Sequence, residues 1–282
     1  MTAAICCYNA EQHIYSAVNS LIKQTKQPDE ILFIDDGSSD DSVKNIQGLP
    51  VKIIKHEANK GLAVARNTAL DNANYEIIVF IDSDTVAHED MIEKMLSYYD
   101  SDDVFGVGGQ GIEVNIKNIF DKWRKYNAHQ SCGESVMKDA GMIPGLCCSF
   151  RKSALEKVGG FDEFFARNAE DHDISIRLRK AGGRLVYSPD IKVDHYRTDS
   201  LTSLVKMIYR YDLWTIIAKK RNRVASGKSS RIPLFRISVF LKRILNIFKG
   251  KPGFKFAIID LLMVFISIGA VFFFFTNRSK LS

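Results

Sequence analysis

An α/β fold is predicted for the first two thirds of this 282-residue chain, followed by basic amphipathic helices and a C-terminal transmembrane helix. Three observations lead to this prediction. Short apolar runs alternate with amphipathic stretches over residues 3–82, the pattern of a sheet covered by helices on both faces. The apolar run Ile77–Ile81 leads directly into D-S-D, so two carboxylates lie at the end of a buried strand. Residues 256–275 carry one charge, Asp260, and at 1.5 Å per residue they span about 30 Å, the thickness of a bilayer's hydrocarbon core.

The elements before D-S-D follow from the periodicity of the apolar residues. Ile14, Val18 and Leu21 recur at helical spacing, whereas residues 3–7 form a short apolar run. A helix start is expected after the loop D-D-G-S-S-D-D-S, capped by Ser39 or Asp40. The predicted order is a strand at 3–7, a helix at 11–24, a strand at 30–34, a helix after residue 40, a strand at 51–55, a helix at 61–72 and a strand at 77–81.

The middle of the chain is less regular. Glycines and short apolar runs predict strands and loops over 104–120, whereas 121–140 is polar and has no clear period. Two glycine pairs, at 159–160 and 182–183, are typical of helix ends. The other elements predicted are a strand at 145–151, a short helix at 153–158, a helix at 170–181 and a strand at 184–187, before Pro189.

The charge of the chain is unevenly distributed. Its 39 Lys and Arg against 33 Asp and Glu give a net charge of +6, and the basic residues are concentrated in 197–255. Two helices are expected there, at 198–220 and 231–248. The second is amphipathic and suits either a lipid headgroup layer or the surface of the globular domain. A basic segment indicates an anionic partner. Because an apolar segment follows it, we expect anionic membrane lipids and no nucleic acid.

The same features predict a compartment. The N-terminus does not fit a signal peptide, because no basic region precedes its short apolar run. Lys249, Lys251 and Lys255 precede the apolar segment, and the positive-inside rule then keeps the main domain cytoplasmic. The five cysteines form no disulfide framework and no C-x-x-C, which suits a reducing compartment. We expect a cell-membrane protein, single-pass or tightly associated, with a cytoplasmic catalytic domain.

The D-S-D triplet is the first candidate site. Ligands of open α/β sheets collect at the carboxyl ends of strands. Asp82 and Asp84, with Ser83 between them, lie at such an end. Paired aspartates there suit a hard divalent cation shared with the phosphates of a substrate, which indicates a nucleotide. The alternative is an Asx-type turn that merely ends the strand.

Two further groups follow the first two strands. Tyr8, between Cys7 and Asn9, can bring its ring to a ligand at the sheet edge, or it is an ordinary aromatic residue at a strand end. Asp36 can accept a hydrogen bond from a base N–H, or it belongs to a turn formed by D-D-G-S.

Charged residues at two helix starts complete the set. Lys60, Gly61 and Arg66 surround one start, where positive side chains beside helix amides favour a pyrophosphate; the alternative is surface charge. Glu170 and Asp171 open another helix. A carboxylate there either caps the helix or acts as a general base that removes a proton from an attacking hydroxyl.

Six motifs occur in a fixed order: C-C-Y-N, I-D-D-G-S-S-D, N-K-G-L-A-V-A-R-N, F-I-D-S-D, V-G-G-F-D-E and E-D-H-D-I-S-I-R-L. In this order they resemble glycosyltransferase family 2, of the membrane-anchored bacterial and archaeal type, over residues 3–197. The resemblance implies the GT-A fold, a Rossmann-like mixed sheet flanked by helices. It also implies inverting transfer of a sugar from a nucleotide diphosphate donor. The Q-x-x-R-W signature of processive polysaccharide synthases is absent, which favours transfer of a single sugar.

The resemblance implies roles on the donor side. Asp36 resembles the base-recognising aspartate, with Tyr8 near the base or ribose. Arg66 resembles a pyrophosphate contact, and Asp82 the D-x-D residue nearer the ribose and sugar. The same donor-binding set includes Cys7, Asn9, Lys60, Gly61 and Ser83. Cysteine stands where the family commonly has proline or threonine before Y-N, so the resemblance gives the Cys7 side chain no specific role.

Further roles concern the metal and the acceptor. Asp84 resembles the metal-binding aspartate, which would hold Mg²⁺ or Mn²⁺, and His195 in V-D-H-Y resembles a histidine that meets the metal or the diphosphate. Asp171 resembles the catalytic base, with Gly145 and Glu170 near the acceptor. UDP is the expected nucleotide of the donor, and the apolar tail favours a lipid-linked acceptor or a surface glycan.

These inferences divide the chain into a glycosyltransferase domain (1–197), basic membrane-proximal helices (198–255) and a transmembrane helix (256–275). Two other functions are considered. A sugar-phosphate nucleotidyltransferase would carry a G-x-G-T-R-like loop after the first strand, where this chain has C-C-Y-N-A-E-Q. A non-catalytic membrane-tethered scaffold would not need Asp82, Asp84 and Asp171.

Overall fold

The computed structural model describes residues 1–128, 130–166, 168–222, 232–248 and 254–277. The chain forms two compact units, Met1–Asn115 with His129–Arg197, and Ile116–Ala128 with Thr198–Ser282. The first unit is α/β, as the sequence predicts, and the second is helical in its described part. Lys249 and Lys251, on which the predicted topology partly depends, lie outside the described residues.

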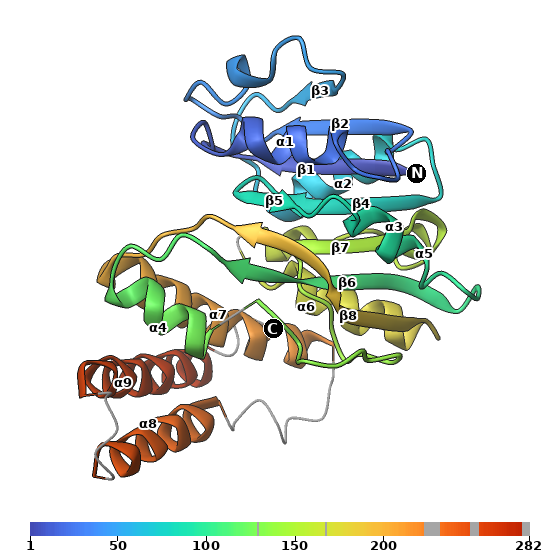
Figure 1. Ribbon diagram of the computed structural model, residues 1–282. Helices are drawn as coiled ribbons and strands as arrows, with labels where there is room; N and C mark the ends of the chain where they lie inside the picture. The colour runs from blue at the N-terminus through green and yellow to red at the C-terminus, as the bar shows by residue number, and fades with distance from the viewer. Residues whose placement is uncertain (129, 167, 223–231, 249–253, 278–282) are drawn as a thin grey trace. The chain divides into compact units, whose positions relative to one another are not determined.

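Eight strands form one mixed sheet in the first unit, in the order β3-β2-β1-β4-β7-β6-β8-β5 (Figure 1). β1 to β4 are parallel to one another where they pair, and β7 is antiparallel to both β4 and β6. β8 is parallel to β6, and β5 is antiparallel to β8. The strands are β1 (Thr2–Cys7), β2 (Glu30–Asp35), β3 (Lys52–Lys55), β4 (Ile77–Asp82), β5 (Thr85–Ala87), β6 (Val104–Glu113), β7 (Cys147–Arg151) and β8 (Arg184–His195).

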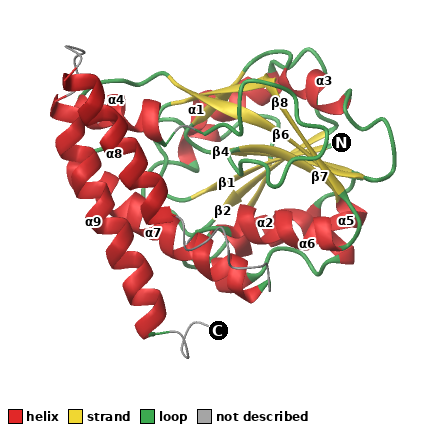
Figure 2. Ribbon diagram, turned by 90° about the horizontal axis from the view of Figure 1, so that it is seen from below, coloured by secondary structure: helices red, strands yellow, loops and turns green. Residues whose placement is uncertain are grey.

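Helices cover both faces of this sheet, as Figure 2 shows. One face carries α1 (Ile14–Ile22) and α3 (Met91–Leu96). The other carries α2 (Leu62–Asn72), α5 (Lys152–Lys157) and α6 (Glu170–Lys180). Successive residues of β1 point to opposite faces, so Ile5 packs in the core under α1 and Ala4 in the core under α2. Because both faces are buried, the strand reads as a continuous apolar run in the sequence.

The region after β2 differs from the prediction. The helix expected there is a single 3-10 turn, η1 (Lys44–Ile46). Asp40 caps no helix; its carboxylate accepts hydrogen bonds from Ser42 N at 3.1 Å and Ser42 Oγ at 2.5 Å. Ser39 N donates to the Asn9 side chain at 2.8 Å. These local bonds compete with helix formation and hold the segment as a loop.

Other elements were not predicted, or only in part, because they are short or interrupted. β5, α3 and the 3-10 turn η2 (Glu163–Phe165) are too short to show a period. β8 was expected to end before Pro189 but continues to His195. The pairing of β8 with β6 is irregular around this proline, between the pairs Gly108–Tyr187 and Gln110–Lys192, and proline is tolerated at such bulges.

The second unit contains four helices in its described part. α4 lies in the polar stretch for which the sequence predicted no structure, and a capping box formed by Asn118 and Asp121 begins it. Trp123 of α4 packs with Leu204, Ile208, Ile259 and Met263 in the core of this unit. The helices are α4 (Ile119–Asn127), α7 (Leu201–Arg221), α8 (Ile232–Phe248) and α9 (Phe254–Thr276).

α9 corresponds to the predicted transmembrane segment. Over Lys255–Thr276 it is the one helix of the described residues that is long and apolar enough to cross a bilayer, by length and composition. About two fifths of its most apolar window, 39%, is buried against the rest of the chain, so it is a candidate span with one protein-facing side.

Candidate active site

The carboxyl ends of three parallel strands are aligned in the first unit. Cys6, near the end of β1, pairs with Ile34 of β2 on one side and with Asp82 of β4 on the other. Tyr8, Asp36 and the D-S-D turn therefore follow neighbouring strands at one edge of the sheet, the edge at which α/β folds bind ligands.

D-S-D forms a tight turn between β4 and β5. Thr85 Oγ1 donates to the carbonyl of Asp82 at 2.7 Å and closes the turn, as the alternative interpretation expected. The carboxylates of Asp82 and Asp84 nevertheless stay about one third exposed, at 35% and 34% of their side-chain surface. The turn thus presents both acids, and Ser83 between them, at the edge of the sheet.

Strand pairing brings His195 to this turn. β5 pairs with β8 so that Thr85 lies opposite His195, and Tyr196 N donates to the carbonyl of Asp84 at 2.9 Å. His195 Nε2 lies 3.4 Å from Asp84 Oδ2. The two residues named as metal ligands are thus adjacent, although 111 positions separate 84 from 195 in the chain.

Glu113 is a site residue that the sequence analysis missed. It ends β6, where the parallel register with β8 places it opposite His195, and its Oε1 lies 3.0 Å from His195 Nδ1. Both side chains are nearly buried. Only the pairing of β6 with β8 identifies Glu113, because no motif surrounds it in the sequence.

His195 and Asp84 shift each other's pKa. Burial alone would lower the pKa of His195, but the carboxylates of Asp84 and Glu113 outweigh it and raise the pKa to about 9. Burial would raise the pKa of Asp84, but His195, together with the charge of Arg197, holds it below its usual range. The imidazole is therefore cationic at neutral pH when no metal occupies the site.

The donor set fits a divalent cation that is shared with a substrate. No group of three or more His, Cys, Asp or Glu side chains in the described part of the chain is arranged to hold a metal alone. Asp84 and His195 supply one oxygen and one nitrogen ligand, and Mg²⁺ commonly takes only one or two protein ligands beside phosphate and water. Glu113 on the far nitrogen of His195 matches the carboxylate that usually orients a metal-bound histidine.

Arg66 joins the D-S-D turn to the E-D pair. Its guanidinium lies 3.4 Å from Asp82 Oδ1 and 3.2 Å from Glu170 Oε1, and it donates to the carbonyl of Gly145 at 2.8 Å. The rings of Phe80 and Phe161 lie 5.6 Å from it. The side chain is 2% exposed. Instead of projecting toward solvent, Arg66 forms the floor between the two acidic motifs.

Gly145 and Asp171 are in direct contact. Gly145 N donates to Asp171 Oδ2 at 3.3 Å, and Asp171 Oδ1 accepts from His172 N at 2.8 Å. A Cβ atom on Gly145 would lie 3.1 Å from the Arg66 nitrogens and 3.2 Å from Asp171 Cβ, so the site is closely packed here. The residue before α6, Ala169, has a φ of 65°, a left-handed conformation that costs energy in an alanine and occurs often at functional sites.

Glu170 has a different environment from its neighbour Asp171. It is 6% exposed. Burial raises the pKa of Glu170 to about 7; Arg66 offsets part of this effect, and the Asp171 carboxylate adds to it. Burial thus makes Glu170 a weaker acid than an ordinary glutamate, whereas its neighbour Asp171 is only partly buried.

Asp36 anchors the loop before α2. It is buried, and its carboxylate accepts from Lys60 N at 2.9 Å and Gly61 N at 2.8 Å, with His56 Nδ1 at 2.7 Å. Gly61 has a φ of 95°, and a Cβ there would lie 2.5 Å from the carbonyl oxygen of Ala166. The Lys60 side chain is exposed at the same loop. Recognition of a base by Asp36 stays a prediction.

Tyr8 and Asn9 are the exposed residues of the C-C-Y-N segment. Cys7 is buried in the core under α1, and its carbonyl accepts from Asp36 N at 2.8 Å. Asn9, with a φ of 52°, accepts from Ser39 N and donates its own N–H to Ser38 Oγ at 3.0 Å. Tyr8 is 51% exposed. The Asn9 side chain is held by Ser39, so the exposed Tyr8 ring is the better placed of the two to meet a ligand.

Comparison with known families and proteins agrees with this geometry. The family model described as "Glycosyl transferase family 2" matches residues 2–159. A pre-mycofactocin glycosyltransferase of Mycobacterium tuberculosis is 30% identical over 178 residues, which cover 58% of this chain and 37% of that protein. A poly-beta-1,6-N-acetyl-D-glucosamine synthase of Staphylococcus aureus is 26% identical over 245 residues, or 83% of this chain and 59% of that protein. The chain thus spans less than two thirds of either relative.

Two solved structures share the fold. The mannosyltransferase PcManGT from Pyrobaculum calidifontis, in complex with GDP-Man and Mn²⁺, aligns with a TM-score of 0.63 at 17% identity, over 98% of this chain and 74% of that one. S. aureus TarS 1–349 in complex with UDP aligns with a TM-score of 0.57 at 19% identity, over 83% and 74%.

Proposed function

This chain belongs to glycosyltransferase family 2, and on that premise we propose that it transfers a single sugar from a nucleotide diphosphate donor to a hydroxyl acceptor with inversion at the anomeric carbon. The observation that carries the proposal is the contact of buried Arg66 with both acidic motifs, Asp82 of D-S-D and Glu170 of E-D. Arg66 thus connects the D-S-D motif, which would face the diphosphate, with the E-D motif, which carries the candidate general base, within one GT-A domain.

On the donor side, the exposed Tyr8 ring and Lys60 side chain are available to the nucleotide, and Asp36 holds the loop that carries Lys60. Asp84 and His195 would hold Mg²⁺ or Mn²⁺, which when bound stabilises negative charge on a departing diphosphate. UDP is our proposed nucleotide. The UDP complex of S. aureus TarS supports it by analogy, whereas the GDP-Man complex of PcManGT offers the alternative.

On the acceptor side, Asp171 acts as the general base. Its carboxylate takes the proton of the acceptor hydroxyl as that oxygen bonds to the anomeric carbon and the bond from carbon to the diphosphate oxygen breaks. Attack from the face opposite the leaving group inverts the anomeric centre. Gly145 N, 3.3 Å from Asp171 Oδ2, supports the position of the carboxylate.

We propose a lipid-linked acceptor or a growing surface glycan at the cytoplasmic side of the cell membrane. The apolar helix α9 supports this location, and so does the similarity to a polysaccharide synthase of S. aureus. Family membership weighs against the nucleotidyltransferase alternative. A scaffold without activity would not need the partly exposed Asp82 and Asp84.

The test is the substitution Asp171→Asn in the full chain. Transfer from the preferred nucleotide sugar should fall by roughly 10²- to 10⁴-fold, the usual contribution of a general base. Thermal stabilisation by the donor with Mn²⁺ should stay unchanged, because Asp171 does not contact the donor phosphates in this scheme. Glu163→Gln, at an exposed carboxylate eight positions before Asp171, is the control.

Two results would change the assignment. Transfer that survives in the Asp171→Asn variant would show that another group removes the proton. A panel of UDP, GDP and dTDP sugars that neither stabilises the wild-type protein nor is hydrolysed by it would favour the scaffold.

A further inference from the structure

The two sides of α9 differ sharply. One side carries large apolar residues that are exposed, with Phe265 62% and Phe272 69% accessible. They recur every three or four positions and so share one side of the helix over about 26 Å. No charged residue interrupts them. The residues of this α9 stripe are Ile258, Leu261, Phe265, Ile268, Phe272 and Phe275.

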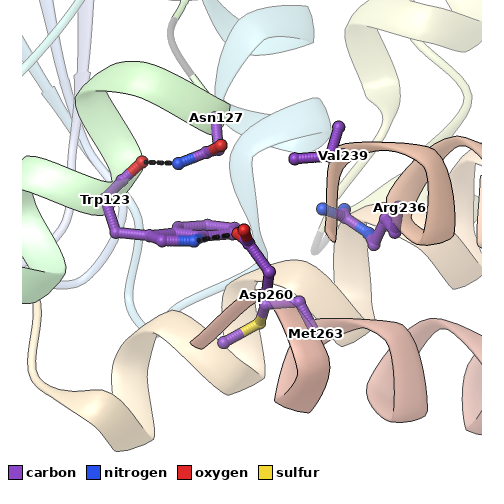
Figure 3. Close-up of a pocket in the computed structure, with 6 residues that line it drawn as sticks. All are labelled: Trp123, Asn127, Arg236, Val239, Asp260 and Met263. Carbon is purple, nitrogen blue, oxygen red and sulfur yellow. Dashed lines mark hydrogen bonds between the residues drawn. The ribbon is translucent and has the colours of Figure 1, made fainter. Parts of the chain in front are cut away.

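The opposite side of α9 makes polar contacts inside the second unit. Asp260 is 2% exposed; it accepts from Trp123 Nε1 of α4 at 2.6 Å and forms an ion pair with Arg243 of α8 (Figure 3 shows the contact with Trp123). Ser267, two turns further along, donates to Asp212 of α7. Bare hydrocarbon around this side would leave these polar groups unsatisfied, so this face of α9 belongs to the protein.

α7 accompanies α9 along most of its length. Ile208 packs in one cluster with Met263, Asp212 contacts Ser267, and Lys220 Nζ lies 5.4 Å from the centre of the Phe274 ring. The outer side of α7 exposes Lys206 and Arg210. If α9 crossed a bilayer, α7 would have to enter it as well, and each central Lys or Arg would cost about 3 kcal/mol by insertion scales.

We infer that α9 lies along the membrane surface, with the α9 stripe among the acyl chains of one leaflet, and does not cross the bilayer. α9 offers only one apolar side to lipid and keeps its polar contacts inside the protein, as interfacial helices do, although it is more apolar than most of them. The exposed lysines Lys242 and Lys255 suit anionic headgroups beside it. The C-terminus then stays on the same side as the catalytic unit. The inference depends on the proposed function only for the idea that the acceptor is lipid-linked.

Vesicle binding tests the surface. Full-length protein is mixed with vesicles of neutral lipid or with 30% anionic lipid and separated by flotation. Replacing both Phe265 and Phe272 by Asp should lower partitioning to the anionic vesicles about tenfold or more, because two large apolar side chains lose their burial. Tyr15→Asp, an exposed aromatic on α1, is the matched control and should not change partitioning. Circular dichroism verifies that each variant is folded.

Topology separates this inference from a single-pass anchor. An epitope tag at the C-terminus should resist protease in intact spheroplasts and become sensitive only after permeabilisation. Cleavage in intact spheroplasts would place the C-terminus outside and overturn the inference. If the double variant floats unchanged but has a smaller oligomeric state than the wild-type protein, the stripe is a self-association surface, and the inference is also overturned.

Hydrolysis of the soluble donor distinguishes the two proposals. The Phe265→Asp, Phe272→Asp double variant should retain donor hydrolysis, because both residues lie in the helical unit. A protein that binds vesicles as expected but hydrolyses no donor would leave the membrane surface intact and refute the proposed function alone.

Discussion

Arg66, Asp36 and Glu113 are nearly buried, whereas Tyr8 and Lys60 are exposed and Asp82 and Asp84 are partly so. Burial separates residues that position other groups from residues that can bind a ligand. The three buried residues hold the acidic motifs, the loop before α2 and the His195 ring in place. They do so through hydrogen bonds between buried groups, which rigidify a site when every partner is satisfied. The others can exchange water for a ligand. Arg66 belongs to the buried group, which its motif alone did not reveal, and its contact with a pyrophosphate stays a prediction.

A substitution at Glu113 tests whether this buried carboxylate positions His195 for metal binding. Glu113→Gln should weaken Mn²⁺ binding about 10- to 100-fold, the usual effect of losing the carboxylate that orients a metal-bound histidine. The amide still fills the space beside His195 Nδ1 but no longer supplies a charge. Mn²⁺ affinity is measured by electron paramagnetic resonance on the full chain in the presence of nucleotide diphosphate.

The control for Glu113→Gln is Glu57→Gln, at an exposed carboxylate outside the site. Equal Mn²⁺ affinity in the wild-type protein and the Glu113→Gln variant would mean that Glu113 only fills space next to β8.

Glu170 predicts a pH effect on stability. Its pKa in the folded state is about 7, above the ordinary 4.5, so the folded protein binds a proton that the unfolded chain releases between these values. The free energy of unfolding should therefore decrease as pH rises from about 4.5 to 7, by up to roughly 3 kcal/mol from this group. Glu170→Gln removes this dependence, so the variant should gain stability relative to the wild-type protein between pH 5 and pH 8.

Urea unfolding at the two pH values measures this difference. The opposite sign, a wild-type protein that gains on the variant toward pH 8, would show that the ion pair with Arg66 outweighs the burial of the carboxylate.

Among the elements, β1 to β4 and the antiparallel β7 were predictable, whereas β5 and the second half of β8 were not. β1, β2 and β4 are buried on both faces and appear as apolar runs, so their ends and the acids that follow them could be placed from the sequence. β5 has three residues, and β8 crosses a proline at a bulge. The partners that meet there, His195 with Glu113, depend on strand register, which is set by pairing between distant segments. The D-S-D and E-D motifs could be identified; the contacts that join them could not.

Two glycines form a matched pair, Gly61 in the loop before α2 and Gly48 between η1 and β3. Gly61 and Gly48 have φ values of 95° and 85°, but only at Gly61 would a Cβ meet backbone, 2.5 Å from the Ala166 carbonyl oxygen; around Gly48 there is open space. Gly48→Ala should cost about 1 kcal/mol for the left-handed conformation alone. Gly61→Ala should cost about 3 kcal/mol or more, because overpacking adds to the same strain.

Urea unfolding of both glycine variants gives the two costs. Donor affinity should fall only in Gly61→Ala, since Gly61 N also donates to Asp36. Similar costs at the two positions would mean that the loop yields to the added methyl group.

At the scale of the whole molecule, the chain leaves its α/β unit twice to build the helical one. Ile116–Ala128 is inserted between two parts of the first unit, and its Trp123 meets Asp260, 137 positions later. Sequence periodicity did not reveal α4, because this short helix lies in a polar stretch. The apolar residues that pack on its Trp123 lie near the far end of the chain. The composition did reveal the basic and apolar character of the tail, which is a property of whole segments and not of contacts.

The last prediction concerns the buried ion pair that ties α8 to α9. Arg243→Met should cost about 3–5 kcal/mol, because Asp260 stays buried without its cation. Adding Asp260→Asn should recover most of this loss, since the amide oxygen can still accept from Trp123 while no charge is stranded. Lys242→Met, at the exposed neighbour of Arg243, should change stability by less than about 0.5 kcal/mol.

Both tryptophans of the chain, Trp123 and Trp214, lie in the helical unit, so tryptophan fluorescence during denaturant unfolding in detergent reports on it directly. Additive losses in the Arg243→Met, Asp260→Asn double variant would show that the two side chains do not interact, and the lock that holds α9 against the rest of its unit would then have to lie at Asp212 and Ser267.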